Sequence, residues 1–280
     1  MTARAIAKEL PARVEVIAPA SLGATAIEAL RVRGIEARVV EAASEHDIVA
    51  WALSGPPGAA ATAELGAACA RAAEAGRPIC LLAPPPKGTG RSAIERAAAL
   101  AYLRAHGAAL AHDVDAWLEA VVALVRFGMP RGPRAAIVAP PGSWLEAQAL
   151  AIVAEAEALG LRAPKLEPDG TDAVLYDPAL GAAPVQPLAI PVIARGELGG
   201  AAPALYGARA ALAAIDMLGH AAERIEVGLG PAPATASAEL EVDREQLQRQ
   251  LAKLSGVARV GDHETKVLLR AYKVPITRQV

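Results

Sequence analysis

The chain has 280 residues, of which 54% are hydrophobic, and its formal net charge is −2 at pH 7. This near-neutral balance gives no field that would attract nucleic acid or an anionic membrane, and a 3% aromatic content leaves few stacking surfaces for single strands. Cys69 and Cys80, without a Cys-x-x-Cys pair, argue against a disulfide framework or a metal site. No run approaches the roughly 20 apolar residues of a membrane span. We therefore expect a cytoplasmic protein that binds neither nucleic acid nor membrane.

The first half of the chain alternates short apolar runs with helical patterns. An apolar run at 13–19 leads through small residues into a predicted helix over 22–33, which should end at Gly34. Further apolar runs follow, and a long helix is predicted over 114–127. The later runs lie at 37–41, 47–51 and 78–83. Such strands are typical of a parallel sheet covered on both faces, so we predict a flavodoxin-like domain over 11–130.

The second half repeats this order. Apolar runs at 134–140 and 162–166 flank a predicted helix over 144–159, and runs at 172–176 and 191–194 precede a predicted helix over 204–218. This pattern predicts a second flavodoxin-like domain over 131–228, shorter because the Pro-rich stretch 177–189 does not favour a full helix. The predicted fold class is α/β, with two doubly wound parallel sheets in which 14–18 and 137–139 are central strands.

The C-terminal part carries a different pattern. Residues 229–238 are rich in Pro and Ala and predict a stiff linker. Asp243 is a plausible cap for a polar helix to about Leu254, and the stretch 239–280 is predicted as a helical extension. It contains Glu264-Thr-Lys-Val-Leu-Leu-Arg-Ala-Tyr-Lys-Val-Pro-Ile-Thr277, a short amphipathic helix followed by a strand-like run.

Ligands of open α/β sheets bind beyond the carboxyl ends of the strands, where helix N-termini offer free amides to anions. Ser21 and Gly23 lie in such a position after the first strand, although an ordinary Ser N-cap with a Gly for close packing is the favoured explanation of the two residues. Gly142 and Ser143 take the same position in the second half. There, neighbouring prolines remove amide donors and Trp144 adds bulk, so the case for an anion is weaker.

A third candidate loop follows the run that ends near residue 83. Lys87, Thr89 and Gly90 combine a cation with flexible backbone near Arg91, which suits an anion. The spacing differs from that of a P-loop, and a solvated turn explains it as well.

These features together resemble the NDP-forming acyl-CoA synthetase superfamily, which includes succinyl-CoA ligase and ADP-forming acetate–CoA ligase. The tail from Glu264 resembles the family's E-x-K-x-L-L-x-x-Y-x-I-P-V-T opening of an ATP-grasp domain, and Ala20-Ser-Leu-Gly23 resembles its Q-S-G-A-L-G loop. The resemblance implies that both loop-linked helices aim at a phosphohistidine. For the complete assembly it implies ATP or ADP, Mg and CoA. It also implies ATP-grasp and CoA-binding domains on a partner chain or on a missing portion, because neither body has a counterpart here.

One position departs from the family. The family's S-H-T-G-A motif corresponds to Lys87-Gly88-Thr89-Gly90, so Gly88 stands where the phosphohistidine is expected. Glycine has no nucleophile to accept a phosphoryl group. None of the chain's 5 histidines has a context that would orient it as a substitute.

Two functions remain open on the sequence. The chain is either part of an acid–CoA ligase that is not competent alone, or a non-catalytic docking or regulatory subunit derived from that family. An oligomer is compatible with both, and the acyl substrate and the nucleotide cannot be derived.

Overall fold

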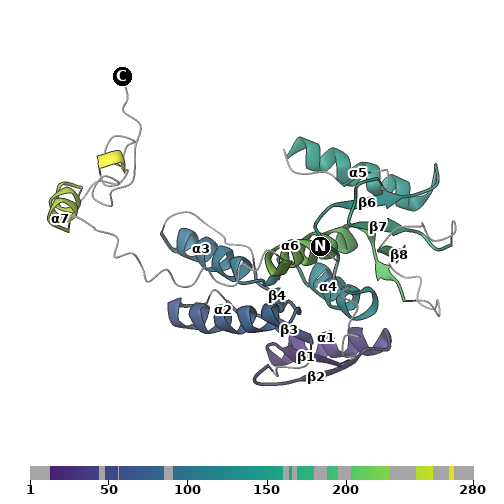
Figure 1. Cartoon of the computed structure of the whole chain (residues 1–280), viewed down its shortest axis with the longest axis horizontal. Helices are drawn as coiled ribbons and strands as arrows, with labels where there is room; N and C mark the ends of the chain where they lie inside the picture. The colour runs from purple at the N-terminus through teal and green to yellow at the C-terminus, as the bar shows by residue number, and fades with distance from the viewer. Residues whose placement is uncertain are drawn as a thin grey trace, which may run out of the picture. The chain divides into compact units, whose positions relative to one another are not determined.

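The computed structural model describes residues 13–43, 48–55, 57–84, 91–159, 164–165, 169–179, 188–194, 203–226, 244–254 and 265–267. Strands and helices alternate through this part and build two parallel sheets (Figure 1). Both sheets belong to one compact unit that runs to Gly230, and the residues from Pro231 onward form a second unit. The α/β class and the two separate parallel sheets confirm the predicted fold.

The first sheet has five strands in the order β2-β1-β3-β4-β5, all parallel. Its strands are β1 (Arg13–Ile17), β2 (Glu36–Val39), β3 (Ile48–Ala52), β4 (Cys80–Leu82) and β5 (Ala109–Ala111). Its helices are α1 (Ala20–Val32), α2 (Ala59–Glu74), α3 (Arg91–Ala105) and α4 (Val114–Phe127). As predicted, β1 is an interior strand, and Gly34 ends α1 with a φ of 66°.

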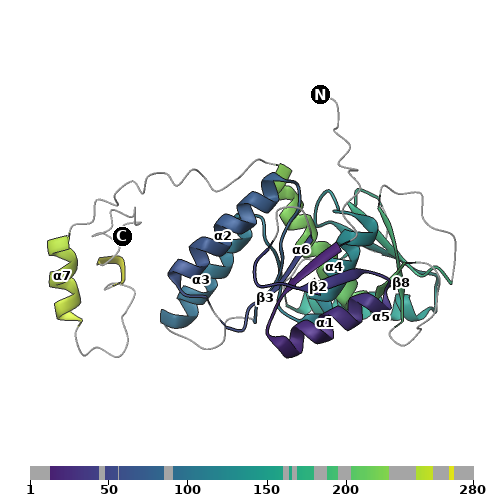
Figure 2. The same cartoon turned by 90° about the horizontal axis from the view of Figure 1, so that it is seen from below.

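Alternating side chains of the first sheet enter two different cores. In β4, Cys80 and Leu82 join the cluster that includes α1 and α4, while Leu81 joins the cluster that includes α2 and α3. Figure 2 shows α2 and α3 side by side. Helices therefore cover both faces of this sheet, as the continuous apolar strands require.

The second sheet has the order β6-β7-β8-β9 and is also parallel. Its strands are β6 (Ala135–Val138), β7 (Ala173–Tyr176), β8 (Ala189–Ile193) and β9 (Leu205–Tyr206), and its helices are α5 (Trp144–Ala158) and α6 (Ala208–Glu226). Lys165 bridges Ala136 in parallel, in the place that β2 takes beside β1. The predicted strand at 162–166 is reduced to this bridge in the described part, and β6 is interior only because of it.

One helix of the second half differs from the prediction. The helix predicted over 204–218 begins only at Ala208 and continues to Glu226. Leu205 and Tyr206 instead pair with Val192 and Ile193 as β9. A strand of two residues has no periodicity that a sequence pattern can reveal.

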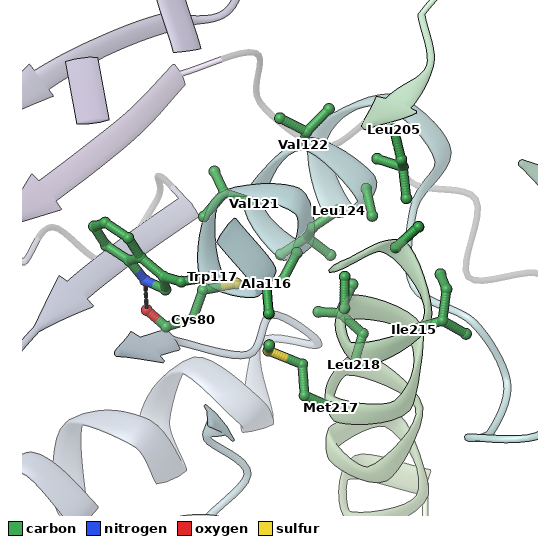
Figure 3. Packing of buried hydrophobic residues seen from close by; sticks show 14 of the residues in the cluster. Cys80, Ala116, Trp117, Val121, Val122, Leu124, Leu205, Ile215, Met217 and Leu218 are labelled. Carbon is green, nitrogen blue, oxygen red and sulfur yellow. Dashed lines mark hydrogen bonds between the residues drawn. The ribbon is translucent and has the colours of Figure 1, made fainter. Parts of the chain in front are cut away.

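A single apolar core joins the two sheets. Helices α4 and α6 pack against each other between the sheets (Figure 1). Trp117 of α4 is fully buried, and its Nε1 donates to the carbonyl oxygen of Cys80 at 2.9 Å (Figure 3). Leu124 of α4 and Leu218 of α6 lie in the same packed group, together with Leu205 of β9. The core of one sheet is thus continuous with the core of the other.

The C-terminal unit is described only in part. It contains α7 (Arg244–Lys253) and a helical turn at 265–267. The helix predicted to extend to about Leu254 corresponds to α7. The predicted linker at 229–238 and the predicted ATP-grasp opening beyond residue 267 lie outside the described residues.

Candidate functional site

The first predicted anion loop leads into α1. The N-cap is Pro19, which offers no side-chain cap, so Ser21 lies inside the first turn and is not the capping residue. The amide of Gly23, expected as an anion donor, already donates to the carbonyl oxygen of Pro19 at 2.8 Å. Gly23 is buried, and an added Cβ would lie 3.2 Å from Cγ2 of Val39. Gly23 therefore serves the close packing of α1 on the sheet edge.

The second predicted loop leads into α5 and is capped from within. Ser143 is the N-cap, and its hydroxyl accepts a hydrogen bond from the amide of Glu146 at 3.2 Å. The carboxylate of Glu146 in turn accepts from the amide of Gly142 at 2.5 Å. A negative charge of the chain itself thus occupies the positive end of this helix. The Ser-x-x-Glu spacing was the available signal in the sequence.

A second carboxylate lies beside this loop. Asp177 follows β7 and is only 6% exposed. Its Oδ2 accepts from Nε1 of Trp144 at 2.5 Å, and its Oδ1 accepts from the amide of Ala179 at 2.8 Å. Two carboxylates near one helix N-terminus disfavour a further anion there by charge repulsion.

The third predicted loop cannot be placed. Lys87, Gly88, Thr89 and Gly90 lie outside the described residues, between the end of β4 and the start of α3. The topology places the departure of this loop at the carboxyl edge of the first sheet, where α1 also begins. Their role stays a prediction.

Three histidines lie in the described part, each with its own partner. Nδ1 of His106 is 2.7 Å from the carbonyl oxygen of Tyr102, and the ring is buried. Nδ1 of His112 is 3.0 Å from the carbonyl oxygen of Ala83. His220 is exposed between two carboxylates of α6. The other two, His46 and His263, fall outside the described residues.

A cavity of about 510 Å³ lies where the two sheets meet. Its walls come from α1 and α4, from Gln148 of α5 and from the start of α6. This volume falls within the range of small-molecule sites. Its charged lining residues are Glu28, Arg33, Asp113, Asp115, Glu119 and Arg209. None of the anion-loop residues Ser21, Gly23, Gly142 and Ser143 lines this cavity.

One wall of the cavity is a buried charged cluster. Nη1 of Arg33 donates to Oε2 of Glu119 at 2.8 Å, and Nη2 donates to the other carboxylate oxygen. The amide of Tyr206 also donates to Oε2 of Glu119, at 3.0 Å. Cζ of Arg33 stacks 3.7 Å from the centre of the Tyr206 ring. The members are 86 and 87 positions apart in sequence, so no local motif predicts the cluster.

The two cysteines lie in the apolar interior of the described part. Burial raises the pKa of both Cys69 and Cys80 to about 12, which keeps the thiols protonated and unreactive. Within the described ranges, no group of three or more His, Cys, Asp or Glu residues could hold a metal ion. No helix among them is both long and apolar enough to cross a membrane.

The fold resembles that of several solved structures, among them an acetyl-coenzyme A synthetase. Acetyl-coenzyme A synthetase 1 of Candidatus Korarchaeum cryptofilum, described as dinucleotide forming and solved with phosphate and ADP, matches at TM-score 0.50 and 12% identity over 78% of this chain and 66% of that chain. Its apo form matches at TM-score 0.49 and 11% identity, over 78% and 67%. PH0766 from Pyrococcus horikoshii OT3 matches at TM-score 0.48 and 13% identity, over 76% and 64%.

The chain thus spans about two thirds of the length of these structures. No protein-family model and no curated protein matches it. At the level of the fold, the chain is similar to an acetyl-coenzyme A synthetase, as the resemblance found in the sequence implies.

Proposed function

We propose that this chain supplies the paired flavodoxin-like portion of an acid–CoA ligase of the NDP-forming acyl-CoA synthetase type, and that it does not complete the reaction alone. The supporting observation is the succession of two parallel sheets in one compact unit, the first in the order β2-β1-β3-β4-β5. This arrangement matches an acetyl-coenzyme A synthetase solved with phosphate and ADP over 78% of the chain.

The proposal assigns the cofactors to other domains. ATP or ADP and CoA would be bound by ATP-grasp and CoA-binding domains, carried by a partner chain or by another part of the protein. Mg²⁺ at nucleotide sites is usually held by one or two carboxylates together with the substrate phosphates. The proposal therefore places Mg²⁺ with the nucleotide, in the ATP-grasp domain.

The proposal also gives this chain no phosphoryl relay of its own. Such a relay needs a side chain that attacks phosphorus and then leaves it, and imidazole does both. Gly88 has no side chain with which to do either. The two helices would then contribute geometry and partial positive charge, but no covalent intermediate.

One observation favours the alternative, a non-catalytic docking or regulatory subunit. At α5, the position that an incoming anion would take is filled by the carboxylate of Glu146. The buried carboxylate of Asp177 lies nearby and is bonded to Trp144. A helix end that is neutralised from within has less to offer a transferred phosphoryl group.

The test compares the wild-type chain with Gly88→His and with Gly88→Ala as the matched control. Each protein is incubated with radiolabelled acetyl phosphate and, separately, with labelled ATP, and is assayed for acid-labile, base-stable phosphate. We expect no such label on the wild type or on Gly88→Ala. Label on any wild-type histidine would overturn the absence of a relay. Label on Gly88→His alone would support a ligase-derived site that retains its geometry, and no label on it would favour the docking subunit.

A further inference from the structure

The cluster of Arg33, Glu119 and Tyr206 joins elements that belong to different sheets. Arg33 directly follows α1, Glu119 lies in the middle of α4, and Tyr206 ends β9. Glu119 is 3% exposed, and the side chain of Arg33 is 12% exposed. A fully desolvated carboxylate is costly unless its oxygens are saturated with donors, and here three donors reach them.

Glu119 completes the hydrogen bonding of an edge strand. The amide of Gly207 donates to the carbonyl oxygen of Ile193 in β8 at 3.0 Å. Neighbouring amides of a strand point to opposite sides, so the amide of Tyr206 points away from β8. No further strand of the described part lies on that side, and Oε2 of Glu119 accepts this amide instead. A side chain of the first half therefore fixes the last strand of the second half.

The remaining contact between α4 and α6 is apolar. The buried residues of α6 include Ala214 and Leu218, and those of α4 include Ala120 and Leu124. Hydrophobic contact has no preferred direction, and apolar cores tend to lose a unique arrangement before they lose stability. A directional contact at one defined point removes this ambiguity.

Stability alone is a poor explanation for the cluster. Replacement of a buried ion pair by apolar side chains of similar volume is often neutral or stabilising, whereas the loss of one partner is destabilising. We propose that Arg33, Glu119 and Tyr206 form a positioning cluster that selects one placement of the second sheet on the first, and with it the shape of the cavity that they line. This inference does not depend on the proposed function.

The decisive variant is the double substitution Arg33→Met with Glu119→Leu, which removes both charges together. Spin labels on Glu74→Cys in α2 and Ala154→Cys in α5, both exposed, report the placement of the two halves by electron–electron double resonance. Cys69 and Cys80 are buried and their thiols stay protonated, so they escape the label. The matched control is Arg209→Met with Glu155→Leu, an exposed ion pair between α6 and α5.

We expect one narrow distance peak for the otherwise wild-type chain and for the control. The double variant leaves only the amide of Tyr206 without its acceptor, so its Tm should fall less than that of Glu119→Leu, while its single peak is lost to a broad or split distribution. Each single variant should lower the Tm, because it leaves one charge buried without its partner. A narrow peak in the double variant would overturn the proposal, because helix packing alone would then set the placement. A lower Tm with a narrow peak would equally overturn it in favour of a stabilising ion pair.

Discussion

Gly219 sits where α6 meets the segment that connects the two sheets. A Cβ added there would lie 2.3 Å from the carbonyl carbon and oxygen of Gly132 and 2.4 Å from the nitrogen of Pro133. All three are backbone atoms, so no side-chain rotation relieves the clash. Gly→Ala in an unobstructed helix interior stabilises by about 0.5–1 kcal/mol. Overpacking of a tight site costs about 1–3 kcal/mol, and occasionally more.

In Gly219→Ala, the steric clash should outweigh the gain in helix propensity, because the backbone of Gly132 cannot move away freely. A Cβ on Gly132 would itself lie 2.7 Å from Oδ2 of Asp172, so that segment is already confined. We expect a net loss of about 2 kcal/mol, equivalent to a fall in Tm of roughly 4–8 °C for a domain of this size. Urea and thermal unfolding measure it, with the m-value as a check that the unfolded state is unchanged.

Gly23→Ala is the matched control within a helix. Its Cβ would come tightly only against the side chain of Val39, at 3.2 Å, because Ala18 lies at ordinary contact distances of 3.8 and 3.9 Å; Val39 is 50% exposed and free to move. We expect this variant to stay within about 1 kcal/mol of the wild type. If Gly219→Ala proved as stable as Gly23→Ala, the inferred contact between α6 and the connecting segment would be wrong.

Three further variants or conditions test other parts of the structure. Trp117→Phe should lose about 1–3 kcal/mol of unfolding free energy, because the hydrogen bond from the indole to the Cys80 carbonyl is lost and the smaller ring leaves a void, and a urea midpoint equal to the wild type would contradict this. Glu146→Ala should cost about 0.5–2 kcal/mol of unfolding free energy, because the cap at the start of α5 is lost. The Tm of this variant should rise with added phosphate, whereas the Tm of the wild type should not. A variant whose Tm does not respond would show that the carboxylate does not block phosphate binding. Burial raises the pKa of Cys69 and Cys80 to about 12, so their contribution to stability is full below about pH 9 and is lost as the pH rises toward 12. The native protein should therefore resist a thiol reagent at pH 8. Rapid modification at this pH would refute the burial of the two thiols.

Hydrophobic patterning predicted what depends on local sequence. The apolar runs near Val14 and Ile137 are strands, and the helix predicted over 114–127 is α4 with the same ends. Each of these segments carries its signal within a few neighbouring residues, through continuous apolar character or through a cap such as Asp113.

The sequence could not predict features set by tertiary contacts. Strand β9 forms because Leu205 pairs with Val192, and two residues are too few to carry a sequence pattern that predicts a strand. The partners of Glu119 are Arg33 and Tyr206, which lie 86 and 87 positions away in the sequence, so no local pattern predicts that this carboxylate is buried. The helix end at Gly142 was the weaker of the candidate anion sites, and the carboxylate of Glu146, four residues later, accepts the hydrogen bond of the Gly142 amide.

The continuity of the core through α4 and α6 bears on how such a duplicated chain can change during evolution. Recombination usually succeeds where few contacts cross the breakpoint. The stretch between α4 and β6 has the sequence position of such a breakpoint, yet α4 keeps one face on the first sheet and the other on α6. A second half acquired from another gene would need apolar side chains that fit against Leu124 and its neighbours. Otherwise this face of α4 would be exposed to water. Each half therefore depends on the other to bury this face.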